Sequence, residues 1–228
     1  MILSPDLMFG ETWTQKAVIP GGVRDLTVGF SIGNKGYVGT GYHSGLFYWY
    51  QDFWEWDPGT NIWTQKADYA GGLIAGAVGF SIGNKGYVGT GTSPTLRKDF
   101  WEYDPFINSW TQRTDFGGTA RAFAVGFSIG SKGYIGTGSI TGGANGCVAD
   151  FWEWESDSNS LNYNIWIQKT SFPGLPRYGS VGFVIGQYGY IGTGQGTGNQ
   201  HLGDFWEWDQ AIDTWIQKAP FGGGPRIG

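Results

Sequence analysis

One thirteen-residue stretch occurs twice in this chain. The letters GFSIGNKGYVGTG fill residues 29–41 and again residues 79–91, and close variants occupy residues 126–138 and 182–194. Self-similarity at a fixed period of about 20 to 50 residues is the signature of a repeat architecture, in which one unit cannot bury its apolar surface alone. The repeat therefore constrains the fold more than any other feature of the chain.

Each repeat contains the same four short segments in the same order. The first reads GFSIG or a variant, the second KGYVGTG, the third DFWEW or DFWEY, and the fourth starts at a tryptophan in W-[TI]-Q-[KR]-[AT]. These tryptophans recur about every 50 residues, at Trp13, Trp63, Trp110, Trp166 and Trp215. The aspartates that open the third segment are Asp52, Asp99, Asp150 and Asp204. Since these residues recur in the copies, we assign them to the frame of the repeat.

The four segments are predicted to be β-strands. They are short, rich in Val, Ile, Tyr, Phe and Trp, and bounded by turn-forming residues, and no stretch carries a helical period. Alternation places Val28, Phe30 and Ile32 on one face of the first strand, with Gly29 on the other, where it would let a neighbouring backbone approach closely. Four antiparallel strands that recur radially predict an all-β propeller, whose blades stack because neither face of a blade can be buried alone.

The predicted domain is a single propeller, or a segment of one. Its four blades span approximately residues 18–67, 68–114, 115–170 and 171–219. Residues 11–17 form an orphan outer strand, and residues 220–228 begin a further blade.

The ordered segments resemble the kelch repeat, in which a glycine doublet ends the second strand, the third strand is aromatic and acidic, and the fourth carries a lone tryptophan. The resemblance covers about residues 11 to 226. The chain departs from the pattern because a threonine separates the two glycines, at Thr40, Thr90, Thr137 and Thr193. The motif DFWEWDP followed by WTQKA is similar to motifs of bacterial secreted kelch proteins, and this resemblance implies an extracellular or cell-surface protein.

Kelch propellers usually close with more than four blades, so the two ends of the repeat array need an explanation. The chain is part of a longer propeller, in which the N-terminal strand completes the last blade, or its open ends pair with another copy and form an oligomer or filament. A closed ring of four blades is the third alternative.

One face of the predicted propeller is the candidate binding face. The loops between the second and third strands, residues 42–51, 92–98, 139–149 and 195–203, share neither length nor sequence, whereas the turns of the opposite face are mostly repeated. Binding residues concentrate on loops that a rigid scaffold carries. The candidate ligand-binding residues on this face are Arg24, Arg121, Arg177, His43, Tyr48, Trp49, Tyr50, Arg97 and His201.

Two roles remain open for the arginines and for the aromatic residues of this face. The kelch resemblance implies that Arg24, Arg121 and Arg177 form a rim that binds acidic peptides, but their five donors suit them equally to hydrogen bonds with carbonyls between blades. The aromatic residues of the first loop, Tyr42 and those at 47–50, either stack on a sugar or anchor a protein, or they cover the open edge of the first blade.

Catalysis is not predicted. Carboxylates that recur in the copies, such as Asp52 and Glu55, are expected to be structural, since a catalytic pair should occur once. His43, Cys147 and His201 lie in loops of three different blades, so no metal or other cofactor is expected. Copper radical oxidases and sialic-acid mutarotases carry similar propellers, but their characteristic residues have no assigned counterparts here.

Composition narrows the class of partner. The net charge of -5 argues against nucleic acid, and no apolar run approaches the roughly 18 residues of a membrane helix. The first ten residues lack the features of a signal peptide. The sequence therefore predicts a non-catalytic scaffold that binds protein, with alternatives of a glycan-binding surface module, a self-assembling structural subunit and a mutarotase-like enzyme.

Overall fold

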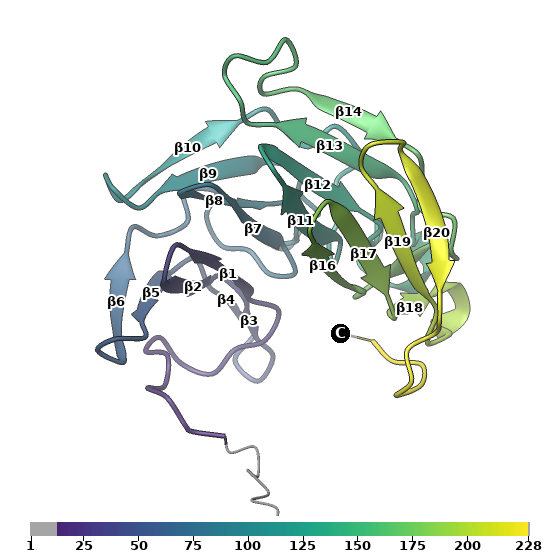
Figure 1. Ribbon diagram of the computed structural model, residues 1–228. Coiled ribbons are helices and arrows are strands. Elements are labelled where there is room, and N and C mark those ends of the chain that lie inside the picture. Colours follow the sequence, from purple (N-terminus) through teal and green to yellow (C-terminus); the bar gives the residue numbers. More distant parts are fainter. Residues whose placement is uncertain (1–12, 228) are drawn as a thin grey trace, which may run out of the picture.

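The computed structural model describes residues 13–227, which form four antiparallel sheets of four strands each, arranged radially as propeller blades (Figure 1). Blade one contains β1 (Val28–Ile32), β2 (Lys35–Gly39), β5 (Phe53–Asp57) and β6 (Ile62–Lys66). Blade two contains β7 (Val78–Ile82), β8 (Lys85–Gly89), β9 (Phe100–Asp104) and β10 (Ser109–Arg113). Blade three contains β11 (Val125–Ile129), β12 (Lys132–Gly136), β13 (Phe151–Glu155) and β14 (Trp166–Lys169). Blade four contains β16 (Val181–Ile185), β17 (Tyr188–Gly192), β19 (Phe205–Asp209) and β20 (Thr214–Lys218). The predicted all-β propeller is confirmed.

Short elements lie in the loops that join the second and third strands of the blades, or just before a first strand. They are β3 (Tyr42–His43), β4 (Tyr48–Trp49), β15 (Arg177–Tyr178) and β18 (Gln195–Gly196), with the 3-10 turns η1 (Ala144–Gly146) and η2 (Thr197–Asn199). In the part of the chain that the structure describes, no helix is long and apolar enough to cross a bilayer.

Neighbouring blades join through their innermost strands, which are β1, β7, β11 and β16. The apolar side chains of one blade pack onto glycines of the next. A Cβ added to Gly79 would lie 2.9 Å from Val28 Cβ, and one added to Gly126 would lie 2.9 Å from Val78 Cβ. These distances are too short for a side chain, so glycine is what permits the close approach of the backbones.

The inserted threonines give the glycine doublet its geometry. Thr40, Thr90, Thr137 and Thr193 all lie in the left-handed region, with φ of 60°, 59°, 58° and 58°. A β-branched residue is rarely found there, and the four side chains are buried with no hydrogen-bond partner for Oγ1 among the described residues. Three of these backbone carbonyls, those of Thr40, Thr137 and Thr193, accept a hydrogen bond from an arginine.

The blades form an arc that is open between blade four and blade one (Figure 1). Strand β1 packs on β7, β7 on β11 and β11 on β16, but β16 has no comparable contact with β1. Val181, Phe183 and Ile185 of β16 are 46%, 41% and 61% exposed, whereas their counterparts in the other blades are buried or nearly so. The alternative of a closed four-bladed ring is therefore wrong for this structure.

The predicted orphan strand at residues 11–17 is not a strand where it can be described. Residues 11 and 12 lie outside the described part, residues 13–17 have no strand assignment, and Trp13 is fully exposed. The physical reason is that no strand within residues 13–227 pairs with them. Ala17 is nevertheless anchored, because its N–H donates to Asn61 Oδ1 at 3.0 Å and its carbonyl accepts from Trp63 Nε1 at 2.9 Å.

Candidate functional site

Three of the candidate binding residues are arginines that pair with an aspartate of their own blade. Arg121 lies just before β11, and its two terminal nitrogens donate to Asp150 Oδ1 and Oδ2 at 2.6 and 2.7 Å. Arg177 makes the same pair of bonds to Asp204 at 2.6 and 2.7 Å. Arg24 pairs with Asp52 through both oxygens, one of them at 2.8 Å. Such a two-bond arrangement is the strongest form of an arginine–carboxylate contact.

The backbones of Arg121 and Arg177 also bond to the preceding blade. The Arg121 N–H donates to the Arg97 carbonyl at 3.1 Å, and the Arg121 carbonyl accepts from Gly91 N–H at 2.7 Å. Arg177 bonds Val148 and Gly138 in the same way. Each of these two residues thus ties a loop of one blade to the aspartate that precedes the third strand of the next, and we call this arrangement the arginine joint. The side-chain bonds of Arg24 stay within blade one.

The arginine joints leave no anion-binding rim of the kind that the kelch resemblance implies. Arg121 is 1% exposed and Arg177 is 0% exposed, and the guanidinium groups also lie over the rings of Phe116 and Phe172. The Arg24 side chain is buried as well. With their donors bound to aspartate and backbone carbonyls, these three residues stabilise their own blades, and Arg121 and Arg177 also join neighbouring blades. This structural role corrects their assignment to the ligand-binding face.

The aspartates that pair with these arginines have lowered pKa values. Burial by itself would raise the pKa of the Asp150 carboxyl, but the hydrogen bonds and charge of Arg121 and the indole N–H of Trp152 hold that pKa below its ordinary value. Asp52 and Asp204 behave alike, with Arg24 and Arg177 as the partners. A carboxyl whose pKa is lower in the folded state stabilises the fold above its unfolded pKa, and that contribution is lost as pH falls through the folded value.

We therefore expect acid to weaken the fold through these joints. Below about pH 4, the usual range of an aspartate pKa, the free energy of unfolding should fall with decreasing pH. Urea titrations at several pH values would measure this slope. The Asp150→Asn variant should start less stable at neutral pH but lose less between pH 5 and pH 3, as about one proton fewer is taken up on unfolding. Equal slopes for the two proteins would contradict the assignment.

Blade two builds its joint differently, because Ile74 replaces the arginine. Asp99 accepts from Trp101 Nε1 at 2.8 Å and from the Tyr69 hydroxyl at 3.4 Å. Burial, with the nearby Asp99 charge, raises the pKa of Tyr69. Arg97, another candidate binding residue, donates to the Gly71 carbonyl at 2.6 Å and is half-buried.

The glutamates that recur on the third strands are held within their own blades. Glu55, Glu102, Glu153 and Glu207 accept hydrogen bonds from the hydroxyls of Tyr37, Tyr87, Tyr134 and Tyr190 at 2.6, 3.1, 2.9 and 2.7 Å. Each recurring aspartate also accepts from the indole two residues on, as Asp150 does from Trp152 at 2.7 Å. The repeated carboxylates thus have structural partners within the repeat.

The loop of residues 42–50 forms a hairpin that stands out from the candidate face. Strands β3 and β4 pair Tyr42 with Trp49 and His43 with Tyr48. The tip exposes Leu46, Phe47 and Tyr48 by 69%, 78% and 51% of their surface. The sequence analysis named Phe47 and Tyr48 among the aromatic residues of this loop but not Leu46, although the Ser44-Gly45 dipeptide before it marks a turn.

The base of the hairpin is an aromatic cluster. The rings of Tyr42 and Trp49 lie 4.8 Å apart, and those of Tyr48 and Tyr50 lie 4.9 Å apart, edge to face. The Arg24 guanidinium covers the Tyr50 ring at 3.7 Å. Trp49 and Tyr50 are therefore only partly exposed, and Tyr50 packs the hairpin against the Arg24–Asp52 pair.

Two hollows flank the hairpin. One, of about 270 Å³, is lined by Tyr48, Tyr50, Gln51, Asp52 and Asp68. The other, of about 150 Å³, is smaller and includes Arg24, Tyr42 and His43. The first combines aromatic rings with carboxylate and amide oxygens, which is the mixture of groups that suits a polar ligand with an apolar face.

The remaining candidates do not gather at one point. His201 is exposed in the fourth loop, whereas the Cys147 thiol lies in the third loop, where it contacts the carbonyls of Ala144 and Gln195. Within residues 13–227, no group of three or more His, Cys, Asp or Glu side chains is arranged to hold a metal ion.

Comparison with known proteins supports the fold and goes no further. No protein-family model and no curated protein sequence matches this chain. Among the solved structures that match, one titled "Structure of YjhT" aligns with a TM-score of 0.77 at 18% sequence identity, covering 95% of this chain and 76% of that chain. At this identity the likeness shows a shared fold alone.

Proposed function

We propose that this chain is a non-catalytic propeller of the kelch type that binds a protein partner through the unlike loops of one face. The 42–50 hairpin is the main contact. The observation that carries this proposal is the exposed tip of Leu46, Phe47 and Tyr48, which an ordered aromatic base holds away from the blade. Exposed apolar groups gathered at one point are typical of a protein contact.

The rigidity of the hairpin favours binding. Its base is pinned by hydrogen bonds between Asp25 and Tyr42 in both directions at 2.9 Å, and by Tyr50 N–H to the Gly41 carbonyl at 2.9 Å. A loop that is already ordered loses less conformational entropy when a partner docks. The repeated frame thus supports affinity, while the unlike loops provide specificity.

A glycan is the second candidate ligand, because of the hollow beside the hairpin. Tyr48 and Tyr50 present aromatic surface there, and Gln51 and Asp68 supply oxygen acceptors and an amide donor. Aromatic rings pack on the apolar face of a sugar, and carboxylates accept hydrogen bonds from its hydroxyls.

The test is to screen the purified chain against an array of secreted and cell-surface proteins and against a glycan array. Protein hits should weaken by at least about tenfold in the Phe47→Ser variant, since a buried aromatic anchor carries much of the energy of an interface. The matched control is Phe106→Ser, because Phe106 is exposed in the turn of the opposite face and should be neutral. Protein binding that survives Phe47→Ser would contradict the hairpin assignment. Glycan hits lost in Tyr48→Ala, without protein hits, would favour the second candidate instead.

A further inference from the structure

The outer face of blade four is built like an inter-blade surface but has no blade on it. Val181, Phe183 and Ile185 occupy the positions whose counterparts in blades one to three pack against the following blade. A hollow of about 280 Å³ remains there, lined by Val181, Phe183, Phe205 and Phe221 among others.

The three joints inside the chain show what such a face packs against. In each, the phenylalanine that begins the third strand contacts two aromatic rings of the next blade. Phe53 lies 4.9 and 5.0 Å from Tyr103 and Trp110, as ring centroids. Phe100 lies 5.1 Å from both Trp154 and Trp166, and Phe151 lies 5.0 and 5.2 Å from Trp208 and Trp215. Phe205 is the fourth member of the series, and its ring contacts within residues 13–227 are confined to its own blade.

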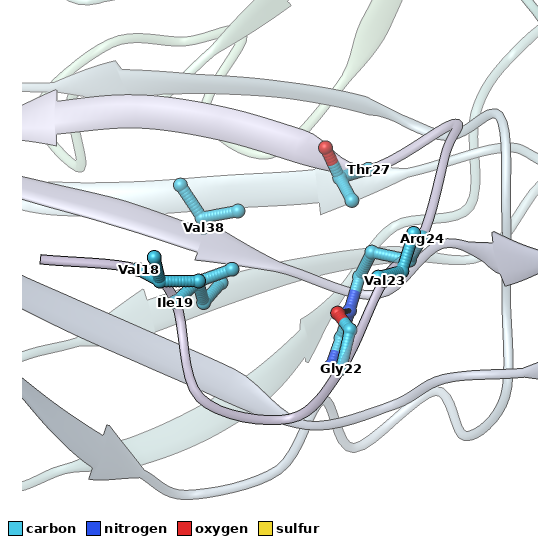
Figure 2. A pocket seen from close by; sticks show the side chains of 7 residues that line it. All are labelled: Val18, Ile19, Gly22, Val23, Arg24, Thr27 and Val38. Carbon is cyan, nitrogen blue, oxygen red and sulfur yellow. Dashed lines mark hydrogen bonds between the residues drawn. The ribbon is translucent and has the colours of Figure 1, made fainter. Parts of the chain in front are cut away.

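Blade one carries the matching surface at the other end of the arc. Trp56 and Trp63 stand at the positions of the two receiving rings, 6.4 Å apart, as Trp154 and Trp166 do in blade three. Beside them is a hollow of about 360 Å³, in which Val18, Ile19 and Val38 lie close together (Figure 2). Val38 is the counterpart of Val88, which packs with Val28 of the preceding blade.

One segment of the receiving surface is identical in sequence to a segment that already receives a blade. Blade one packs on residues 79–91 of blade two, and residues 29–41 of blade one repeat those thirteen letters. A Cβ at Gly29 would meet nothing closer than 3.8 Å, whereas one at Gly79 would collide with Val28. The position that receives a neighbour in blade two is therefore open in blade one.

We propose that blade four of one copy docks onto blade one of a second copy, as a fourth joint of the kind found three times within the chain. Phe205 then lies between Trp56 and Trp63 of the second copy, and Val181 and Phe183 cover its Gly29 and Gly36. Because the two surfaces differ, the contact is head to tail, and its repetition gives a ring or a filament.

Docking requires one of two terminal segments to be displaced, because both would occupy the same place. Residues 219–226 of the first copy and residues 17–24 of the second would occupy equivalent places. The Arg226 backbone bonds Gly194 and Leu202, but no carboxylate within residues 13–227 pairs with its side chain. Arg24 holds Asp52 with its side chain, so its backbone can take over the bonds to Gly194 and Leu202 and complete an arginine joint.

The test uses two variants of the 228-residue chain with one blocked end each. Gly29→Val fills the receiving surface of blade one, and Phe183→Asp places a charge on blade four, with Ile185→Asp as a second variant in case the first does not fold. Sedimentation velocity should show the wild-type chain growing from 24.9 kDa to multiples of that mass as concentration rises. Each variant alone should stay monomeric, and an equal mixture should form a dimer that grows no further.

Three outcomes would overturn the proposal. They are a wild-type chain that stays monomeric throughout, an oligomer that either single variant leaves intact, and a mixture that remains monomeric although both variants keep the wild-type circular dichroism spectrum.

Discussion

Replacing Arg121 with methionine is expected to lower the free energy of unfolding by about 3–5 kcal/mol. The side chain is buried, donates to both Asp150 oxygens and to the Thr137 carbonyl at 2.9 Å, and lies over the Phe116 ring. Methionine fills much of the volume but leaves the Asp150 carboxylate without its cation. Urea unfolding followed by tryptophan fluorescence would measure the loss.

Arg226→Met is the matched control, because Arg226 occupies the same place in the repeat without a carboxylate partner. Its side chain donates to the Gly223 carbonyl and lies over Phe221, and it is exposed, so its replacement should cost less than about 1 kcal/mol. Adding Asp150→Leu to Arg121→Met should restore part of the loss, since removing both members of a buried pair is far less costly than removing one. Similar losses for Arg121→Met and Arg226→Met would show that the ion pair contributes little.

The strands and their grouping into blades could be predicted because the same strand and turn patterns occur in four copies. Each strand carries its alternation and its turn residues four times, so a local ambiguity in one copy is resolved by the others. Gly33 illustrates this, since the positive φ it adopts between β1 and β2 recurs at Gly83, Gly130 and Gly186. Propensity, turn chemistry and periodicity all favour the same fold.

The role of the arginines could not be derived from the sequence. Arginine suits an anion-binding rim and an inter-blade joint equally, and the deciding partner of Arg121 is Asp150, which lies 29 residues further along the chain, just before β13. The sequence also left open whether the aromatic residues of the first loop are exposed or cover an edge of the blade, and it did not indicate Leu46. The exposure of Leu46 and Phe47 depends on what surrounds them in space, which no repeat pattern records because that loop occurs in one copy only.

The second large effect is expected at a glycine within the identical thirteen-residue segments. Gly79→Val should lower the free energy of unfolding by about 1–3 kcal/mol, because its Cβ would lie 2.9 Å from Val28 Cβ and 3.2 Å from Phe30 Cδ1, and the blades would have to separate. Gly29→Val should be neutral or slightly stabilising, because the space beside Gly29 is open and valine favours a strand.

The comparison isolates packing between blades, because Gly29 and Gly79 share their following twelve residues, their strand pairing and their turn. Both variants are measured at high dilution, where end-to-end docking of copies does not contribute to stability. Equal losses of stability at the two positions would show that the strand backbone itself requires glycine. A loss at Gly79 alone would show that packing against the neighbouring blade requires it, and that the equivalent packing surface of blade one is unoccupied.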